Sequence, residues 1–296
     1  MMKTAMDDRI FQILVHIALA LLAFVTFYPF WNALVVSFNE GMDTTLGGIT
    51  FWPRKFTFEN YGYVLKDSRI LTGFGISIAR TISGTLLTIA GTAIFAYGMS
   101  RKELIGRRYY MIFAIITLYF GGGLIPTYIL IRGLGMFNTF WVYIIPSIIS
   151  VWSMIIFRTF FREIPAGLED AARIDGCGYW GTFLRVVLPL SGPVVATLAL
   201  FTAIAHWNDW FVASIYINNE HLIPVQTLLK RTIDSNISRE LVSDSAAASF
   251  VAKTQTYTTK SLIMATMMVT TFPIIIVYPF LQRFFVKGVL VGSLKE

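Results

Sequence analysis

The chain has 296 residues, of which 55% are hydrophobic and 14% are charged, and its net charge at pH 7 is +7. Soluble domains contain about 25% charged residues, so this composition excludes an ordinary water-soluble protein and favours an integral membrane protein. The positive balance suits contact with anionic lipid headgroups, and we expect membrane lipid but no nucleic acid among the partners.

Six segments free of Asp, Glu, Lys and Arg are each at least 20 residues long, the length that a helix needs to cross a hydrocarbon core of about 30 Å. They predict an all-α integral membrane protein with six transmembrane helices. The first segment is too long and is followed by residues too bulky for a cleaved signal peptide, so we expect a span there. The predicted spans are at about 10–38, 75–100, 109–131, 136–158, 190–217 and 259–283.

The basic residues predict the topology of the chain. Six spans place both termini on one side, whose loops hold thirteen Lys and Arg against ten on the other side. The short loop 101–108 alone holds four of the thirteen, and short loops are the ones that the positive-inside rule weighs. We therefore expect a single transmembrane domain over 1–296 with cytoplasmic termini, a cytoplasmic loop at about 159–189, and extracytoplasmic segments at about 39–72 and 218–258.

The polar segment 159–189 has the features of a short exposed helix. Pro165 can begin the helix, because its missing N–H would have no partner in the first turn anyway. Gly176 can end it in a left-handed cap. Side chains three and four residues apart are expected to share one face, here Leu168, Ala171, Ala172 and Asp175. The charges that can anchor its flanks are Glu169, Asp170, Arg173 and Asp175.

A second turn is expected after this helix, with a break at Pro189. Its apolar side chains are expected on one side: Trp180, Phe183, Leu184 and Val187. The alanines of the first helix leave a shallow face that can enter a groove of another protein closely. We therefore interpret 159–189 as a docking loop; an amphipathic helix lying on the membrane is the alternative.

Three consecutive glycines, Gly121 to Gly123, interrupt the third span and precede Pro126, which removes a backbone hydrogen bond. Backbone without partners is tolerated at membrane depth only where it is buried in protein or lines water. Tyr119 and Tyr128 flank the interruption, and aromatic faces stack against sugar rings. These features predict a translocation path that includes Tyr119, Gly122 and Tyr128, with close helix packing and core aromatics as the alternatives.

The fifth span contains Trp207, Asn208 and Asp209. A carboxylate facing lipid at the bilayer centre costs about 2.5–3.5 kcal/mol, so Asp209 is expected to face a wet cavity, a partner subunit or the outer headgroups. Trp207, Asn208 and Asp209 together suit contact with a sugar; a structural hydrogen bond to a neighbouring helix or cap is the alternative. Arg80 is expected to be structural and to reach the outer interface with its long side chain.

The sequence indicates neither a catalytic nor a metal site. A single cysteine, Cys177, excludes an internal disulfide and a four-ligand zinc site. No phosphate-binding Gly-Lys-Ser loop is present, so any ATP has to be bound by another chain. We expect no enzyme activity and no cofactor here. A multi-span membrane enzyme and an ion-coupled carrier are the alternatives, although the paired membrane charges and internal repeats usual in such carriers are not visible.

The pattern Asp170-Ala171-Ala172-x-x-x-Gly176, followed by Leu188-Pro189, resembles the EAA loop of ABC importer permeases, which contacts the ATPase; Asp170 replaces the family's usual Glu. Further stretches resemble carbohydrate-importer permeases of the maltose-permease-like superfamily, and the most similar branch takes larger or acidic oligosaccharides such as alginate or pectin fragments. These stretches are 60–61, 121–128, 158–161, 207–210 and 285–288.

The resemblance implies the type I ABC importer permease fold in a bacterial cytoplasmic membrane, and alternating access driven by ATP. The implied partners are a second homologous permease, an ABC ATPase dimer that binds ATP and Mg, an extracytoplasmic sugar-binding protein and an oligosaccharide substrate. The sequence leaves the sugar and its length open. The implied ATPase-coupling residues are Glu169, Asp170, Ala171, Ala172, Asp175, Gly176 and Pro189.

Overall fold

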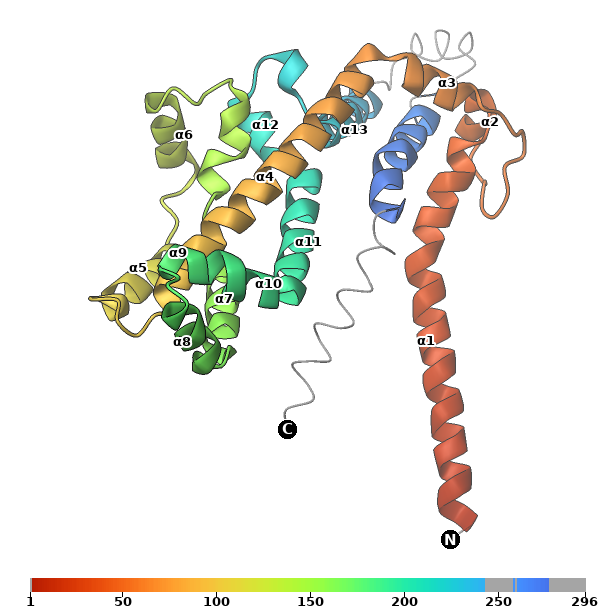
Figure 1. Cartoon of the computed structure of the whole chain (residues 1–296). Coiled ribbons are helices and arrows are strands. Elements are labelled where there is room, and N and C mark those ends of the chain that lie inside the picture. The colour runs from red at the N-terminus through yellow and green to blue at the C-terminus, as the bar shows by residue number, and fades with distance from the viewer. Residues whose placement is uncertain (1, 243–257, 259, 277–296) are drawn as a thin grey trace. The chain divides into compact units, whose positions relative to one another are not determined.

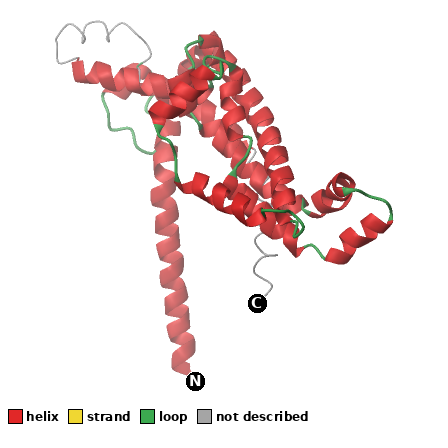
Figure 2. Ribbon diagram, turned by 90° about the vertical axis from the view of Figure 1, so that its left-hand side faces the viewer, coloured by secondary structure: helices red, strands yellow, loops and turns green. Residues whose placement is uncertain are grey.

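The computed structural model describes residues 2–242, 258 and 260–276. These residues are mostly helical, and the only strand-like pairing among them is one isolated bridge between Asn39 and Phe56 (Figure 2). The chain divides into two compact units. The first comprises Met1–Ser68 and Arg231–Phe272, and the second consists mainly of Arg69–Lys230. The two units are described separately below.

The first unit contains one long apolar helix and the polar segment that follows it. Asn39 is fully buried and its amide donates hydrogen bonds to Asp43 Oδ2 (3.0 Å) and Thr44 Oγ1 (3.1 Å). Asn60 donates to the carbonyl oxygens of Ser37 and Asn39, both at 2.9 Å, so buried amides fold this segment onto the end of the helix. The helices are α1 (Met2–Ser37), α2 (Gly41–Thr45), α3 (Glu59–Lys66), the later part of α13 (Val225–Val242) and Lys260–Ile276 (Figure 1).

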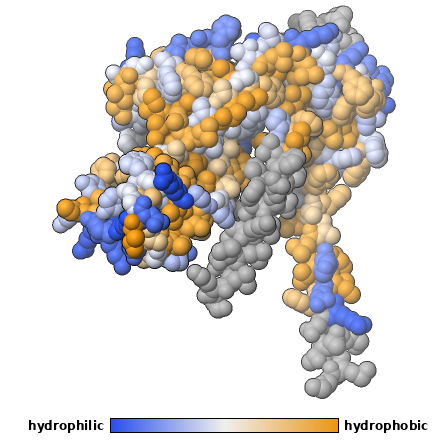
Figure 3. Space-filling view, viewed as in Figure 1, coloured by the Kyte–Doolittle hydropathy of each residue, from blue (hydrophilic) through white to orange (hydrophobic). Residues whose placement is uncertain are grey.

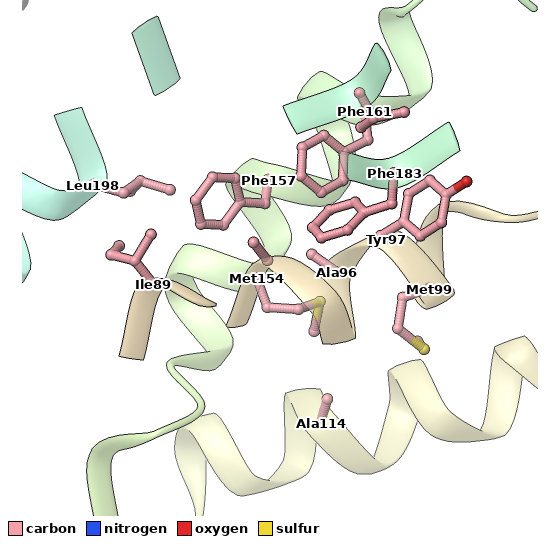
Figure 4. Packing of buried hydrophobic residues seen from close by; sticks show 12 residues of the cluster. Ile89, Ala96, Tyr97, Met99, Ala114, Met154, Phe157, Phe161, Phe183 and Leu198 are labelled. Atoms are coloured by element: carbon pink, nitrogen blue, oxygen red, sulfur yellow. The ribbon is translucent and has the colours of Figure 1, made fainter. Parts of the chain in front are cut away.

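The second unit is built along α4 (Ser68–Ser100), which has no internal proline. An apolar core forms where α4, α5 and α7 meet, with Met154 and Phe157 fully buried at its centre (Figure 4). The other helices are α5 (Arg107–Tyr119), α6 (Leu124–Gly133), η1 (Phe140–Tyr143), η2 (Ile145–Ser147), α7 (Val151–Glu163), α8 (Ala166–Ile174), α9 (Tyr179–Thr182), η3 (Phe183–Val187), α10 (Leu188–Leu190), α11 (Gly192–Asn208), α12 (Phe211–Tyr216) and η4 (Glu220–Leu222).

Among the described residues, two helices, Arg9–Ser37 and Ser68–Ser100, are long and apolar enough to cross a membrane as single helices. Three helix pairs that could each form one further span bend at a break, by 114° between α5 and α6, 45° between Phe140–Ser147 and α7, and 81° between Tyr179–Leu190 and α11. The first bend falls at the glycine run that the sequence predicts to interrupt the third span. The second lies inside the predicted span 136–158, and the third at the start of the predicted span 190–217. The sixth predicted span, 259–283, is described as the helix Lys260–Ile276, and its remaining residues lie outside the described part.

The breaks have local causes. Gly123 has a φ of +85°, which favours glycine, so the helical chain stops at the Gly121–Gly123 run. The two consecutive glycines before it have no side chain to pack, and α6 restarts at Leu124. At the third bend, Ser191 separates α10 from α11, and Gly192-Pro193 begins the new helix with proline in its first turn. The glycine run was thus read correctly as an interruption, whereas the break predicted at Pro189 falls two residues later.

Hydrophobic residues cover large areas of the helices, as Figure 3 shows in orange. Hydrophilic residues, in blue, gather at the end of the second unit that carries α8 and the start of α5. The most apolar stretch of α1 has no residue buried inside the chain, which is the distribution expected of a helix that faces lipid or another subunit.

Candidate functional site

The helix predicted after Pro165 is present as α8 (Ala166–Ile174), and Pro165 is the residue that caps it. Gly176 has a φ of +83°, and its N–H donates to the carbonyl of Arg173 at 3.0 Å. The next N–H, that of Cys177, donates to Ala172 at 2.9 Å. Those two bonds define a Schellman motif, so the predicted left-handed cap at Gly176 is confirmed.

The adjacent alanines of α8, Ala171 and Ala172, do not share a face. Ala172 is buried against its own chain, whereas Ala171 is exposed. Leu168, Asp170 and Asp175 are exposed as well, so the expectation that Ala172 lies on the same open face as Leu168 and Ala171 is wrong. Adjacent helical positions differ by about 100°, and the contact of α8 with its own chain at Ala172 decides which of the two alanines points outward.

Glu169 is buried inside the chain, although we expected it to be a flanking charge available to a partner. Its carboxylate makes a two-pronged ion pair with the Arg101 guanidinium, Nη1 to Oε2 and Nη2 to Oε1, the second at 2.7 Å. The Arg101 guanidinium also lies 4.2 Å from the centre of the Tyr97 ring. Burial lowers the pKa of Arg101, yet a guanidinium stays charged at any physiological pH. In the sequence, Arg101 indicates only the topology, through the basic loop 101–108, and no local pattern links it to Glu169.

The turn after α8 also divides its apolar side chains between two sides. Phe183 and Val187, four residues apart, are buried in the core that also holds Tyr97 (Figure 4). Trp180 and Leu184 are exposed by 62% and 55%, so the expectation of one common apolar side is wrong. Pro189 lies in the first turn of α10. The exposed side chains of the docking loop from α8 onward include Leu168, Asp170, Ala171, Arg173, Ile174, Asp175, Tyr179, Trp180, Leu184 and Arg185.

Asp209 ends α11 and caps α12. Its Oδ1 accepts hydrogen bonds from the backbone N–H groups of Phe211 (3.0 Å) and Val212 (3.2 Å). Its Oδ2 accepts from Arg80 Nη2 at 2.7 Å. The side chain of Asp209 is 28% exposed and that of Arg80 only 1%. These contacts match the alternative of a structural hydrogen bond to a neighbouring helix and a cap.

Arg80 therefore does not extend to an outer interface as we expected. Its guanidinium lies 4.7 Å from the centre of the Tyr143 ring, and among the described residues its Nε and Nη1 have no hydrogen-bond partner. Next to this pair, His206 packs against Gly84, where an added Cβ would lie 2.6 Å from the imidazole Nε2. Helices α4 and α11 thus approach each other closely beside an ion pair that joins α4 to the start of α12.

The remaining residues predicted for a translocation path are in different environments. Tyr119 is 84% exposed, and Gly122 is exposed in the break before α6. Tyr128 stacks on Tyr216, with ring centres 6.0 Å apart, so it belongs to a packed aromatic cluster. Trp207 is buried, and its indole N–H has no hydrogen-bond partner among the described residues. Asn208 is exposed. A role of these residues in transport stays a prediction.

Comparisons with known proteins connect this arrangement with a class of membrane transporters. The family of binding-protein-dependent transport system inner membrane components matches residues 8–291. The chain belongs to this family, and it is therefore a multi-pass subunit of an inner-membrane transport system.

Several relatives match over nearly their full length. The polygalacturonan/rhamnogalacturonan transport system permease protein YtcP of Bacillus subtilis (strain 168) is 34% identical, over 98% of this chain and 100% of that protein. The arabinooligosaccharides transport system permease protein AraQ of Halalkalibacterium halodurans is 27% identical, over 95% and 96%. A chain of the crystal structure of a bacterial ABC transporter involved in the import of alginate, an acidic polysaccharide, is 29% identical and superposes with a TM-score of 0.86, over 94% and 98%.

Proposed function

We propose that this chain is the permease subunit of an ATP-driven oligosaccharide importer and forms half of its translocation path. The observation that carries the proposal is α8, a nine-residue helix that is capped at Gly176, fixed on its inner side through Glu169, and exposed at Leu168 and Ala171. A helix that is fixed on its inner side and exposes apolar side chains on its outer side is suited to a groove of a partner. Because the sequence has no phosphate-binding loop, that partner supplies the ATPase activity.

The partners follow from this assignment. An ABC ATPase dimer would bind ATP and Mg and receive α8, whose exposed charges are Asp170 and Arg173, with Asp175 directly after the helix. A second homologous permease would complete the path, and an extracytoplasmic sugar-binding protein would deliver the cargo. Alternating access then requires that ATP binding move the docking loop and reorient the path. The chain itself would be non-catalytic.

We infer that both termini and the docking loop are cytoplasmic, since the basic short loop 101–108 and α8 lie at the same hydrophilic end of the second unit (Figure 3). A thiol reagent that cannot cross membranes should label a cysteine added at Glu296 only after permeabilisation. This labelling is made in a Cys177→Ser chain, because Cys177 is half-buried in the docking loop. Labelling of the added cysteine in intact cells would overturn this topology.

The cargo we favour is an acidic oligosaccharide, because the relatives described above include permeases named for polygalacturonan and for alginate. An unpaired Asp209 would repel such a cargo. The ion pair with Arg80 cancels that charge, which removes this objection to an oligo-uronide.

Purification from native membranes in mild detergent tests the assignment. We expect the chain to bring with it a second permease and two ATPase subunits, and the reconstituted complex to hydrolyse ATP faster when a sugar-loaded binding protein is added. A membrane enzyme or an ion-coupled carrier would purify and act without an ATPase. Isolation of an active chain without any ATPase would therefore refute the proposal.

A panel of oligosaccharides then identifies the cargo. Galacturonate and alginate oligomers should compete for uptake by the reconstituted complex, and a neutral arabino-oligosaccharide of equal length is the matched control. Uptake of the neutral oligomer alone would retain the importer assignment and refute the acidic cargo.

A further inference from the structure

Helix α4 makes two ion pairs with segments that are distant in sequence. Arg80 lies within α4, and Arg101 directly follows its last residue, Ser100. Arg80 pairs with Asp209 at the start of α12, and Arg101 pairs with Glu169 in α8. We call these the α12 ion pair and the α8 ion pair. Arg80 and Arg101 are 21 positions apart, which corresponds to about 30 Å of helix.

The α8 ion pair fixes orientation as well as distance. Arg101 Nη1 donates to Glu169 Oε2, and Nη2 donates to Oε1. This planar, paired geometry allows little rotation of one partner against the other. The side chains of Arg101 and Glu169 are only 14% and 9% exposed, so water screens their attraction weakly.

The support for Arg101 comes from the core of the unit. The Tyr97 ring beneath the guanidinium packs against Phe183, with ring centres 4.9 Å apart, and against Phe161. Arg158 Nε donates to the carbonyl of Met99 at 3.1 Å, and Arg107 Nη1 to the carbonyl of Arg101 at 3.2 Å. Cations at carbonyls that have lost their helical partners stabilise the end of α4. The arginine that holds α8 therefore rests on a fixed support.

We propose that the α8 ion pair makes the docking helix move as one body with α4, and that Arg101 and Glu169 are positioning residues for coupling. Displacement of α8 is then transmitted along α4, a helix without internal proline, to the α12 ion pair at the break between α11 and α12. This inference rests on the proposed function, in which an ATPase displaces α8.

A cross-link between the two positions tests whether α8 and α4 move together. The Arg101→Cys/Glu169→Cys double variant, in a Cys177→Ser chain, lacks the ion pair, and a short bifunctional thiol reagent replaces it by a covalent bond. Before cross-linking, we expect the number of ATP molecules hydrolysed per sugar transported to be about fivefold that of the wild-type complex. A fivefold change is about the lower end of the usual energetic coupling between two sites. Cross-linking should restore the wild-type ratio. Complete loss of transport on cross-linking would show that α8 has to move against α4 and would overturn the proposal.

Charge variants test whether the ion pair itself matters. Glu169→Gln should uncouple hydrolysis from transport while the complex still assembles, and the reversed pair Arg101→Glu/Glu169→Arg should recover part of the coupling. Glu103→Gln changes the same charge at an exposed position of the loop 101–108, outside the docking loop, and is the matched control. An unchanged ratio of ATP hydrolysed to sugar transported in Glu169→Gln would refute the positioning role.

The two proposals fail in distinguishable ways. If the wild-type complex contains no ATPase, the proposed function is wrong. Suppose instead that the wild-type complex transports sugar and that Glu169→Gln lowers only the yield of assembled complex. If the assembled variant then hydrolyses as much ATP per sugar as the wild type, the importer assignment stands and the ion pair is merely structural.

Discussion

The α12 ion pair and the α8 ion pair use the same three chemical groups in different surroundings. Each joins an arginine of α4, or of the residue after it, to a carboxylate, and each guanidinium lies over a tyrosine ring, Tyr143 at 4.7 Å or Tyr97 at 4.2 Å. Arg80 is 1% exposed, and it makes a single contact with Asp209, at Nη2. Arg101 is 14% exposed and contacts Glu169 with two nitrogens.

This difference teaches where each pair contributes most. Removing one partner of a deeply buried pair leaves a charge without water or counter-charge, and the loss falls on stability. Arg101 is closer to water than Arg80, and the α8 ion pair has the more directional geometry, so its loss should fall on orientation and coupling. The following substitutions test this contrast, from the largest expected effect to the smallest.

Asp209→Asn should have the largest effect, because it leaves the Arg80 guanidinium, whose side chain is only 1% exposed, without its counter-charge. We expect a loss of about 3–5 kcal/mol in the free energy of unfolding, measured as thermal or denaturant unfolding in detergent. Arg80→Met/Asp209→Asn should recover part of this loss, since it removes the isolated charge. Glu169→Gln, which leaves the more exposed Arg101, should cost less, about 1.5–3 kcal/mol. A greater loss in Glu169→Gln than in Asp209→Asn would contradict the comparison.

Gly84→Ala should destabilise the protein by about 1–3 kcal/mol, because the added Cβ would lie 2.6 Å from the His206 ring beside the α12 ion pair. Gly98, near the other end of α4, has nothing within 4 Å of an added Cβ. Gly98→Ala should therefore be neutral or stabilise the helix by up to about 1 kcal/mol. Equal losses in the two variants would mean that helix packing is no tighter at the α12 ion pair.

Gly176→Val changes the cap of α8 and leaves both ion pairs in place. A β-branched residue at φ +83° costs about 1–2 kcal/mol and should misorient the end of the docking helix. We expect insertion into the membrane to survive and sugar-stimulated ATP hydrolysis to fall. Normal stimulated hydrolysis in this variant would show that the α8 ion pair alone sets the orientation of α8.

The tyrosine hydroxyls give the smallest effects. Tyr143 donates a hydrogen bond to the carbonyl of Leu222 at 2.7 Å, whereas the Tyr97 hydroxyl is buried with no hydrogen-bond partner among the described residues. Tyr143→Phe should cost about 0.5–1.5 kcal/mol of stability. Tyr97→Phe should cost nothing, and both keep the ring beneath the arginine. A comparable loss in Tyr97→Phe would reveal a partner of its hydroxyl in the assembled complex.

The features that the sequence predicted correctly depend on neighbouring residues. Hydrophobic run length indicated a membrane protein, Pro165 and Gly176 bounded α8, and the glycines before Pro126 broke the third span. In each case the physical cause acts within one continuous stretch of chain. The causes are a missing N–H, a permitted positive φ and the length of an apolar run. The interruption between α10 and α11 was placed two residues too early, because a proline in the first turn of a helix is tolerated.

The errors concern contacts across the fold. Periodicity assigned Ala171 and Ala172 to one face, but the contact of α8 with its own chain buries only Ala172. Asp209 and Trp207 were grouped by sequence as a sugar-like environment, yet Asp209 is paired with Arg80 and Trp207 is buried. A side chain's exposure depends on what packs against its helix, and adjacent residues of one helix face different neighbours.

The sequence by itself determined that this chain lies in a membrane, that it carries a short capped helix after Pro165, and that it has no phosphate-binding loop of its own. Only the tertiary structure decided which carboxylate each arginine of the α4 region meets. Arg101 and Glu169 are 68 residues apart, and Arg80 and Asp209 are 129 apart. Local hydrogen bonding and helical periodicity carry no information over such separations, because those pairings depend on where helices cross and how closely their side chains let them approach.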